Sequence, residues 1–255
     1  QVIEDGMAEA VGGLLEAEIG RMVESALTGL FDDLQNIPLV LDTGLGAAEP
    51  ARLLLSLTPT QLDIEQTNFL RFMIEGQVAQ DMDVESVHPD PGMPVYSDSA
   101  WTELPGMGMG VSIRLGLINA LLHEVWRAGT LTLAPELPDE IAFLVERVEV
   151  DAMLQPMVAP SIGPAQYPLE IQLGELLLRV RKMGNADFDT YAVTIRSGMA
   201  LVFEEGRLQI DVSERPEVGV ALIEQVSDSP LPSILLEQAV KSLVWDEIQA
   251  AVVNG

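Results

Sequence analysis

The stretch GVSIRLGLINALLHEVWRAGTLTL, residues 110–133, decides the predicted fold because its hydrophobic period changes twice. Val111, Ile113 and Leu115 alternate with polar residues, which is the pattern of a β-strand. From Leu115 onward the apolar positions recur at helical spacing, which predicts an amphipathic helix of about four turns. Gly129 lies where a left-handed C-cap is expected, and alternation restarts after it. The stretch therefore predicts a strand, a helix and a strand, with the apolar helix face on the sheet.

The polar residues of this helix share one face. Asn119, His123 and Arg127 fall on the side opposite the apolar stripe. That side of an amphipathic helix is expected to face solvent. His123 and Arg127 are therefore predicted to be solvated surface residues rather than members of a site.

The composition excludes several classes of function. The chain has 40 acidic and 13 basic residues, a net charge of −27, which excludes nucleic-acid binding by phosphate neutralisation. There is no cysteine, so neither disulfide nor thiolate chemistry is available. No apolar run approaches the ~18 residues that span a bilayer. The apolar content of 48% is nevertheless enough for a sizeable core.

The rest of the chain predicts one α+β domain over residues 1–255. The longest elements are amphipathic helices over residues 4–34 and 231–253, and strands over 51–80, 169–181 and 190–212. We also expect a turn or bend at 58–60, a loop over 81–106, a bulge at Gly174 and a hairpin turn over 184–187. Because the chain begins at Gln1 rather than at a methionine, we expect a processed protein or a fragment of a longer one. We also expect a bacterial protein that is exported to the periplasm, the cell surface or the medium.

No catalytic motif is visible, so we expect a protein that is not an enzyme and that uses no cofactor. Carboxylates at alternate positions can converge on calcium, and Asp81, Asp83 and Glu85 have that spacing, as do Asp187 and Asp189. Neither group has the glycine and terminal glutamate of a complete calcium loop. The favoured interpretation is surface and turn acids, with no metal site.

Asn119 and the exit Ala128-Gly129-Thr130-Leu131 carry a resemblance to a known family. The stretch is similar to the central strand–helix unit in the C-terminal barrel of the bactericidal/permeability-increasing protein family, within the tubular lipid-binding (TULIP) superfamily. Ser112 departs from the pattern, because it lies farther from Asn119 than in that unit. The order of long helices and long strands also follows the family. The family has a final strand after its last helix, and because none is visible before Gly255 we expect a terminal strand to be missing.

The resemblance implies a strongly curved antiparallel sheet wrapped around long amphipathic helices, with an elongated cavity between them. It implies non-enzymatic binding or transfer of a phospholipid or fatty-acyl ligand. The apolar residues expected to line the cavity are Leu115, Ile118, Leu122, Val125, Trp126, Leu14, Met22, Leu236, Val240 and Leu243. The basic surfaces with which animal members bind lipopolysaccharide are absent here, so that ligand is not expected.

Two alternatives remain open from the sequence. The first is a structural or surface-assembly subunit that keeps the fold but fills the cavity with side chains, and whose partner would be another domain or protein chain. The second is an enzyme, for which no nucleophile–base pair or metal set can be named.

Overall fold

The computed structural model of the chain is mostly β-strand. It describes residues 37–41, 51–65, 69–81, 86–88, 92, 113–134, 137, 142–163, 166–204, 207–213, 215–228, 230–241 and 245. The chain divides into two compact units, Gln1–Pro38 with Leu54–Val78, and Leu39–Leu53 with Ala79–Gly255. The helix predicted over residues 4–34 and most of the loop over 81–106 lie outside the described residues, and the single domain over 1–255 stays a prediction.

A three-stranded sheet is formed by β1 (Ile37–Leu41), β2 (Ala51–Glu65) and β3 (Phe69–Gln80), in that order. The Asp81 amide donates to the Arg52 carbonyl at 3.0 Å, and the Thr60 hydroxyl donates to the Met73 carbonyl at 3.3 Å. The extended structure predicted over residues 51–80 is confirmed for 51–65 and 69–80, and residues 66–68 lie outside the described part. The bend predicted at residues 58–60 is wrong, because β2 continues through Pro59, whose fixed φ is compatible with an extended backbone.

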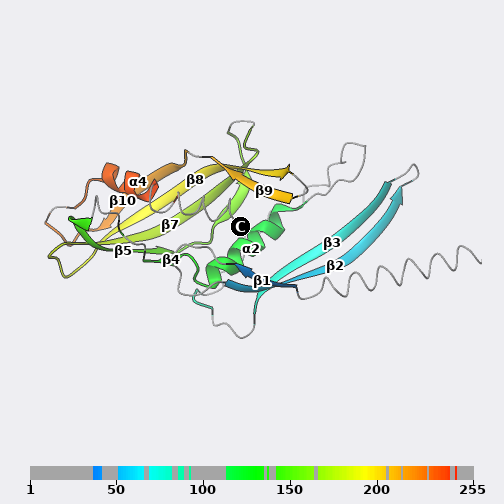
Figure 1. Cartoon of the computed structure of the whole chain (residues 1–255), viewed down its shortest axis with the longest axis horizontal. Coiled ribbons are helices and arrows are strands. Elements are labelled where there is room, and N and C mark those ends of the chain that lie inside the picture. Colours follow the sequence, from blue (N-terminus) through cyan, green and yellow to red (C-terminus); the bar gives the residue numbers. More distant parts are fainter. Residues whose placement is uncertain are drawn as a thin grey trace, which may run out of the picture. The chain divides into compact units, whose positions relative to one another are not determined.

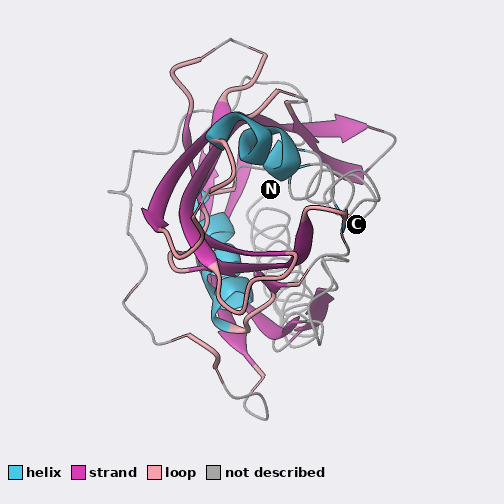
Figure 2. Cartoon of the chain, turned by 90° about the vertical axis from the view of Figure 1, so that its left-hand side faces the viewer, coloured by secondary structure: helices cyan, strands magenta, loops and turns pink. Residues whose placement is uncertain are grey.

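A second, seven-stranded antiparallel sheet has the strand order β10-β8-β7-β5-β4, with β6 paired to β7 and β9 paired to β8. Its strands are β4 (Thr132–Leu133), β5 (Val145–Ala152), β6 (Met157–Pro160), β7 (Leu169–Lys182), β8 (Asp189–Glu204), β9 (Arg207–Val212) and β10 (Glu217–Glu224). The strands run side by side in Figure 1, and Figure 2 shows the sheet curling strongly into a half-barrel. The predicted curved antiparallel sheet is therefore present.

Strand β7 contains the predicted bulge. Its pairing with β8 shifts between Leu173 and Leu176, and Glu175 has a φ of 48°. Such an extra residue lets the apolar alternation resume on the same face of the strand. The turn predicted after β7 is also confirmed, with Gly184 at a φ of 82°.

The two described helices are short. Helix α2 spans Leu115–Arg127, as its periodicity predicts, and Gly129 follows it at a φ of 77°. The strand predicted before it is wrong at Ile113 and Arg114, which have no regular structure. Helix α4 spans Ser233–Val240, only part of the helix predicted over 231–253, so long helices are not confirmed. Neither of these two described helices is long and apolar enough to cross a membrane.

The hydrophobic core joins α4 to the inner face of the seven-stranded sheet. Alternate residues of a strand point to one face, so β5, β7 and β8 each contribute every second side chain. The strand residues buried there include Val148, Val150, Leu178, Val180, Val193 and Ile195. Leu236, Val240 and Trp245 from the C-terminal segment belong to the same cluster. The inner face of the half-barrel is therefore packed with side chains at this place.

Candidate functional site

Helix α2 turns its polar face toward the sheet. Asn119 is 1% exposed and His123 is 5% exposed, whereas Arg127 is half-buried. The prediction that His123 is a solvated surface residue is therefore wrong, and Arg127 is only partly accessible. The reason is that each of these polar side chains has hydrogen-bond partners, which removes the cost of burying it. Asn119 bonds to β6, His123 to Gln155 between β5 and β6, and Arg127 to Glu124 and Ser86.

Asn119 completes the free edge of strand β6. Its Nδ2 donates to the Val158 carbonyl at 3.0 Å, and the Val158 amide donates to its Oδ1 at 2.7 Å. Strand β6 pairs with β7 on its other side. The carboxamide of Asn119 therefore acts as a one-residue strand partner, satisfying both backbone groups of a buried residue.

Two further residues attach α2 to the connection between β5 and β6. The Trp126 Nε1–H donates to the Ala152 carbonyl at 2.6 Å, and the His123 Nδ1 is hydrogen-bonded to the Gln155 side chain. Together with Asn119 they follow helical spacing, so they share one helix face. That face is the one by which α2 is fixed to the sheet.

Residues 86–88 hold the C-terminal end of α2. The Val87 amide donates to the Arg127 carbonyl at 2.8 Å, and the His88 ring stacks on Trp126 with centroids 4.7 Å apart. Gly129 allows this approach, because a Cβ at that position would lie 2.7 Å from a methyl group of Val87. A residue with a side chain would also be strained at the φ of Gly129.

Because its polar face is bonded to the sheet, α2 leaves its apolar stripe partly accessible. Leu115, Ile118 and Leu122 are only half-buried, and they border the core rather than belonging to its buried part. These are three of the residues predicted to contact lipid. We call them the α2 stripe.

The other predicted lining residues divide into two groups. Val125, Trp126, Leu236 and Val240 are buried in the described part of the molecule. Leu14, Met22 and Leu243 lie outside the described residues. Lipid contact by any of these residues stays a prediction.

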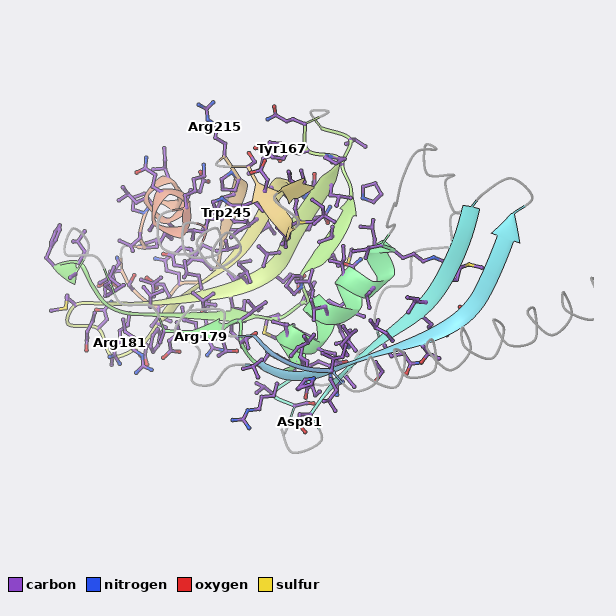
Figure 3. The ribbon with its side chains drawn as sticks, turned by 45° about the vertical axis from the view of Figure 1, so that its right-hand side comes forward. Asp81, Tyr167, Arg179, Arg181, Arg215 and Trp245 are labelled. Atoms are coloured by element: carbon purple, nitrogen blue, oxygen red, sulfur yellow. The ribbon has the colours of Figure 1, made fainter. Side chains whose placement is uncertain are left out.

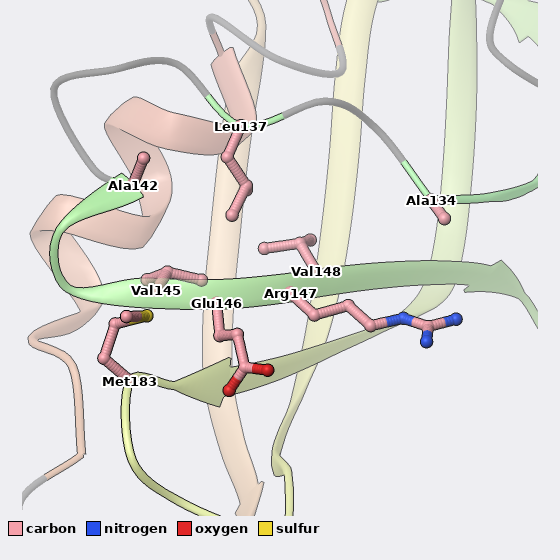
Figure 4. A pocket seen from close by; sticks show the side chains of 8 residues that line it. All are labelled: Ala134, Leu137, Ala142, Val145, Glu146, Arg147, Val148 and Met183. Carbon is pink, nitrogen blue, oxygen red and sulfur yellow. The ribbon is translucent and has the colours of Figure 1, made fainter.

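A separate hollow of about 600 Å³ lies beside the start of β5. Figure 4 shows its lining, which is apolar except for Glu146 and Arg147: Ala134, Leu137, Ala142, Val145, Val148 and Met183. Its volume falls within the range of small-molecule sites. None of the residues predicted to line a lipid cavity is among these eight. Alternating apolar residues in the sequence predict strand β5, but no pattern in the sequence indicates that Leu137 and Met183 lie beside it.

Ion pairs occupy the outer face of β5 and β7. Arg147 lies 2.9 Å from Glu149, which also lies 3.9 Å from Arg179, and Arg181 lies 3.0 Å from Glu146. Figure 3 shows Arg179 and Arg181 on the side of the sheet opposite Trp245. Each of these arginines has a carboxylate partner, so the group is not arranged as a phosphate site.

The segment before α4 is held by two residues of β8. Burial alone would raise the pKa of the Asp189 carboxyl, but hydrogen bonds from the Ser227 hydroxyl and the Ser227 and Val226 amides lower it below its ordinary value. Burial raises the pKa of Tyr191, whose hydroxyl oxygen accepts from the Leu231 amide at 3.1 Å. Asp189 therefore has a structural role instead of the calcium-binding one that was considered from its spacing.

Of the acidic candidates Asp81, Asp83 and Glu85, only the first belongs to the described part of the chain. Asp81 is half-buried there, whereas Asp83 and Glu85 lie outside it. Among the described residues, no three histidine, aspartate or glutamate side chains are grouped to hold a metal ion.

Comparison with known proteins adds no relative: no family model, no curated protein and no solved structure matches this chain.

Proposed function

We propose that this protein binds a long apolar ligand, a phospholipid or a fatty acid, without catalysing a reaction, and that the α2 stripe contacts its acyl chain. The observation that carries the proposal is the orientation of α2. Asn119 and Trp126 are bonded to the second sheet and Val125 is buried, whereas Leu115, Ile118 and Leu122 of the α2 stripe are only half-buried. A helix in a packed core normally has the opposite orientation.

Burial of an acyl chain supplies enough free energy for such a ligand to bind. Each methylene group buried from water contributes about 0.8 kcal/mol, so one long acyl chain contributes roughly 10 kcal/mol before ordering costs. Binding needs only apolar contact and shape. The tubular lipid-binding architecture, with long helices inside the curled sheet, supplies the wider cavity in this proposal. Export and bacterial origin stay predictions.

A second candidate is a structural or surface-assembly subunit. It is favoured by the core beneath α4, where Leu236, Val240 and Trp245 fill the inner face of the sheet with side chains. In that case the half-exposed α2 stripe would be covered by another protein chain, and no lipid would be present.

The deciding experiment is organic extraction of the protein purified without detergent, followed by mass spectrometry. We expect stoichiometric lipid with the natural sequence and its loss with Ile118→Asp, which places a carboxylate on the stripe. The matched control is Ile162→Asp, in an exposed loop, which should keep the lipid. Circular dichroism of both variants separates loss of ligand from loss of fold.

Two results would contradict the proposal. One is the absence of lipid together with no uptake of a fluorescent fatty acid. The other is equal lipid in the Ile118→Asp and Ile162→Asp variants, which would show that the α2 stripe is not the site. A detergent-free dimer with no lipid would instead support the assembly subunit.

A further inference from the structure

Strand β10 is a long outer edge of the seven-stranded sheet. It pairs with β8 from Glu217 to Glu224, and no other described strand pairs with it. Two other described edges of this sheet are closed, whereas the outer edge of β9 is also without a described strand partner. Strand β4 has two residues, and the free edge of β6 is occupied by Asn119. β10 therefore offers a row of backbone donors and acceptors for which the described residues provide no strand partner.

The sequence of β10 is suited to accepting a strand. It reads EVGVALIE and contains neither lysine nor proline, and its pairing with β8 is regular from Glu217 to Leu222, with a bulge before Glu224. Leu222 is 39% exposed and Ile223 is 58% exposed, whereas Val218 and Val220 are half-buried on the inner face. An added strand would cover apolar side chains and satisfy backbone groups at the same time.

The charges of β10 select against a second copy of this chain. Its only charged residues are Glu217 and Glu224, at the two ends and both exposed. Antiparallel pairing of two β10 strands over their full length would bring each Glu217 close to the Glu224 of the other copy, and like charges at facing positions are unfavourable. Each copy also carries a net charge of −27. The same two carboxylates favour a partner with basic residues at those positions.

We propose that β10 is a docking edge for an extended segment of another protein, apolar at alternate positions and carrying lysine or arginine opposite Glu217 and Glu224. Backbone hydrogen bonds supply most of the affinity in this kind of recognition, and the side chains supply specificity. The inner-face residues of the partner pack beside Val218 and Val220. This inference is independent of lipid binding, because β10 and the α2 stripe are separate features.

The test uses the full chain and a fluorescent probe peptide, Lys-Thr-Val-Thr-Val-Thr-Val-Lys, with both termini blocked. Its valines fall on the inner face when its C-terminal lysine lies opposite Glu217, and its N-terminal lysine then lies beside Glu224. Fluorescence anisotropy should show it binding about tenfold more tightly than the same peptide with glutamate at both ends. A third peptide, N-methylated at two adjacent central residues, loses a donor on each edge and should not bind.

Variants of the protein test the location. Glu217→Lys/Glu224→Lys should invert the preference, so that the glutamate-ended peptide binds more tightly. Glu75→Lys/Glu146→Lys changes the net charge equally at exposed positions on other strands and should leave the preference as it is. Hydrogen exchange with saturating peptide should protect backbone amides within residues 217–224.

Three outcomes would overturn the inference. One is equal binding of the lysine-ended and N-methylated peptides, which would mean general attraction to an acidic protein. Another is an unchanged preference in Glu217→Lys/Glu224→Lys. The third is a dimer in sedimentation velocity whose residues 217–224 are already protected, which would make β10 an interface between two copies.

Discussion

Replacing Asn119 by alanine tests how the polar face of α2 is held against the second sheet. The substitution leaves the Val158 N–H and C=O groups buried without partners, because both bond to the Asn119 carboxamide. An unsatisfied buried polar group costs about 1–3 kcal/mol, so the free energy of unfolding should fall by about 2–5 kcal/mol. For a chain near this size, that corresponds to a decrease in Tm of about 5–15 °C.

The assay is thermal and urea unfolding followed by circular dichroism and tryptophan fluorescence. Asn185→Ala is the matched control, because Asn185 lies exposed in the turn between β7 and β8 and its side chain makes no described hydrogen bond. It should change stability by less than about 0.5 kcal/mol. If the two variants unfold alike, the carboxamide of Asn119 does not close the edge of β6, and the explanation of the α2 orientation fails.

Two other predictions concern single groups. Because the folded pKa of Asp189 lies below the ordinary value of 3.8, its contribution to stability is complete above that pH and is lost as pH falls through the folded pKa. Asp189→Asn, which weakens the bonds from Ser227, should lower stability by about 2 kcal/mol at neutral pH and flatten the acid limb of a stability–pH curve. Gly129→Ala should lower the free energy of unfolding by about 1–3 kcal/mol, because the φ of Gly129 is positive and Val87 occupies the space of the new Cβ. Gly116→Ala should raise it by about 0.5–1 kcal/mol, because Gly116 lies within α2 and its new Cβ would meet open space. Equal effects of the two glycine substitutions in urea titration, or an unchanged acid limb for Asp189→Asn, would contradict these assignments.

Local features were predictable because they depend on neighbours in the chain. The period of residues 115–127 predicts α2, and Gly129 predicts its left-handed end. Gly174 indicates the bulge of β7 because the apolar alternation on either side of it is out of step. The turn at Gly184 follows from the same kind of local conformational preference.

The candidate site was predictable only in part. Leu115, Ile118 and Leu122 were selected as apolar helix residues, and the structure leaves them half-buried. The sequence could not identify the face by which α2 is attached, because the partners of Asn119 and Trp126 are backbone groups of Val158 and Ala152. Backbone groups are present at every position, so no residue type marks them in advance.

The sequence by itself determined the helix α2, the long strands with their bulge and turns, the acidic surface and the lack of cysteine chemistry. Only the tertiary structure decided which face of α2 is buried, what lines the hollow beside β5 and which strand forms an open edge. The physical reason is that the spacing of apolar residues along the sequence shows only how polar each face of a helix or strand is on average. Burial also depends on hydrogen-bond partners, and here they are supplied by segments up to 44 residues away, as in the bond from the Gln80 side chain to the Glu124 carbonyl.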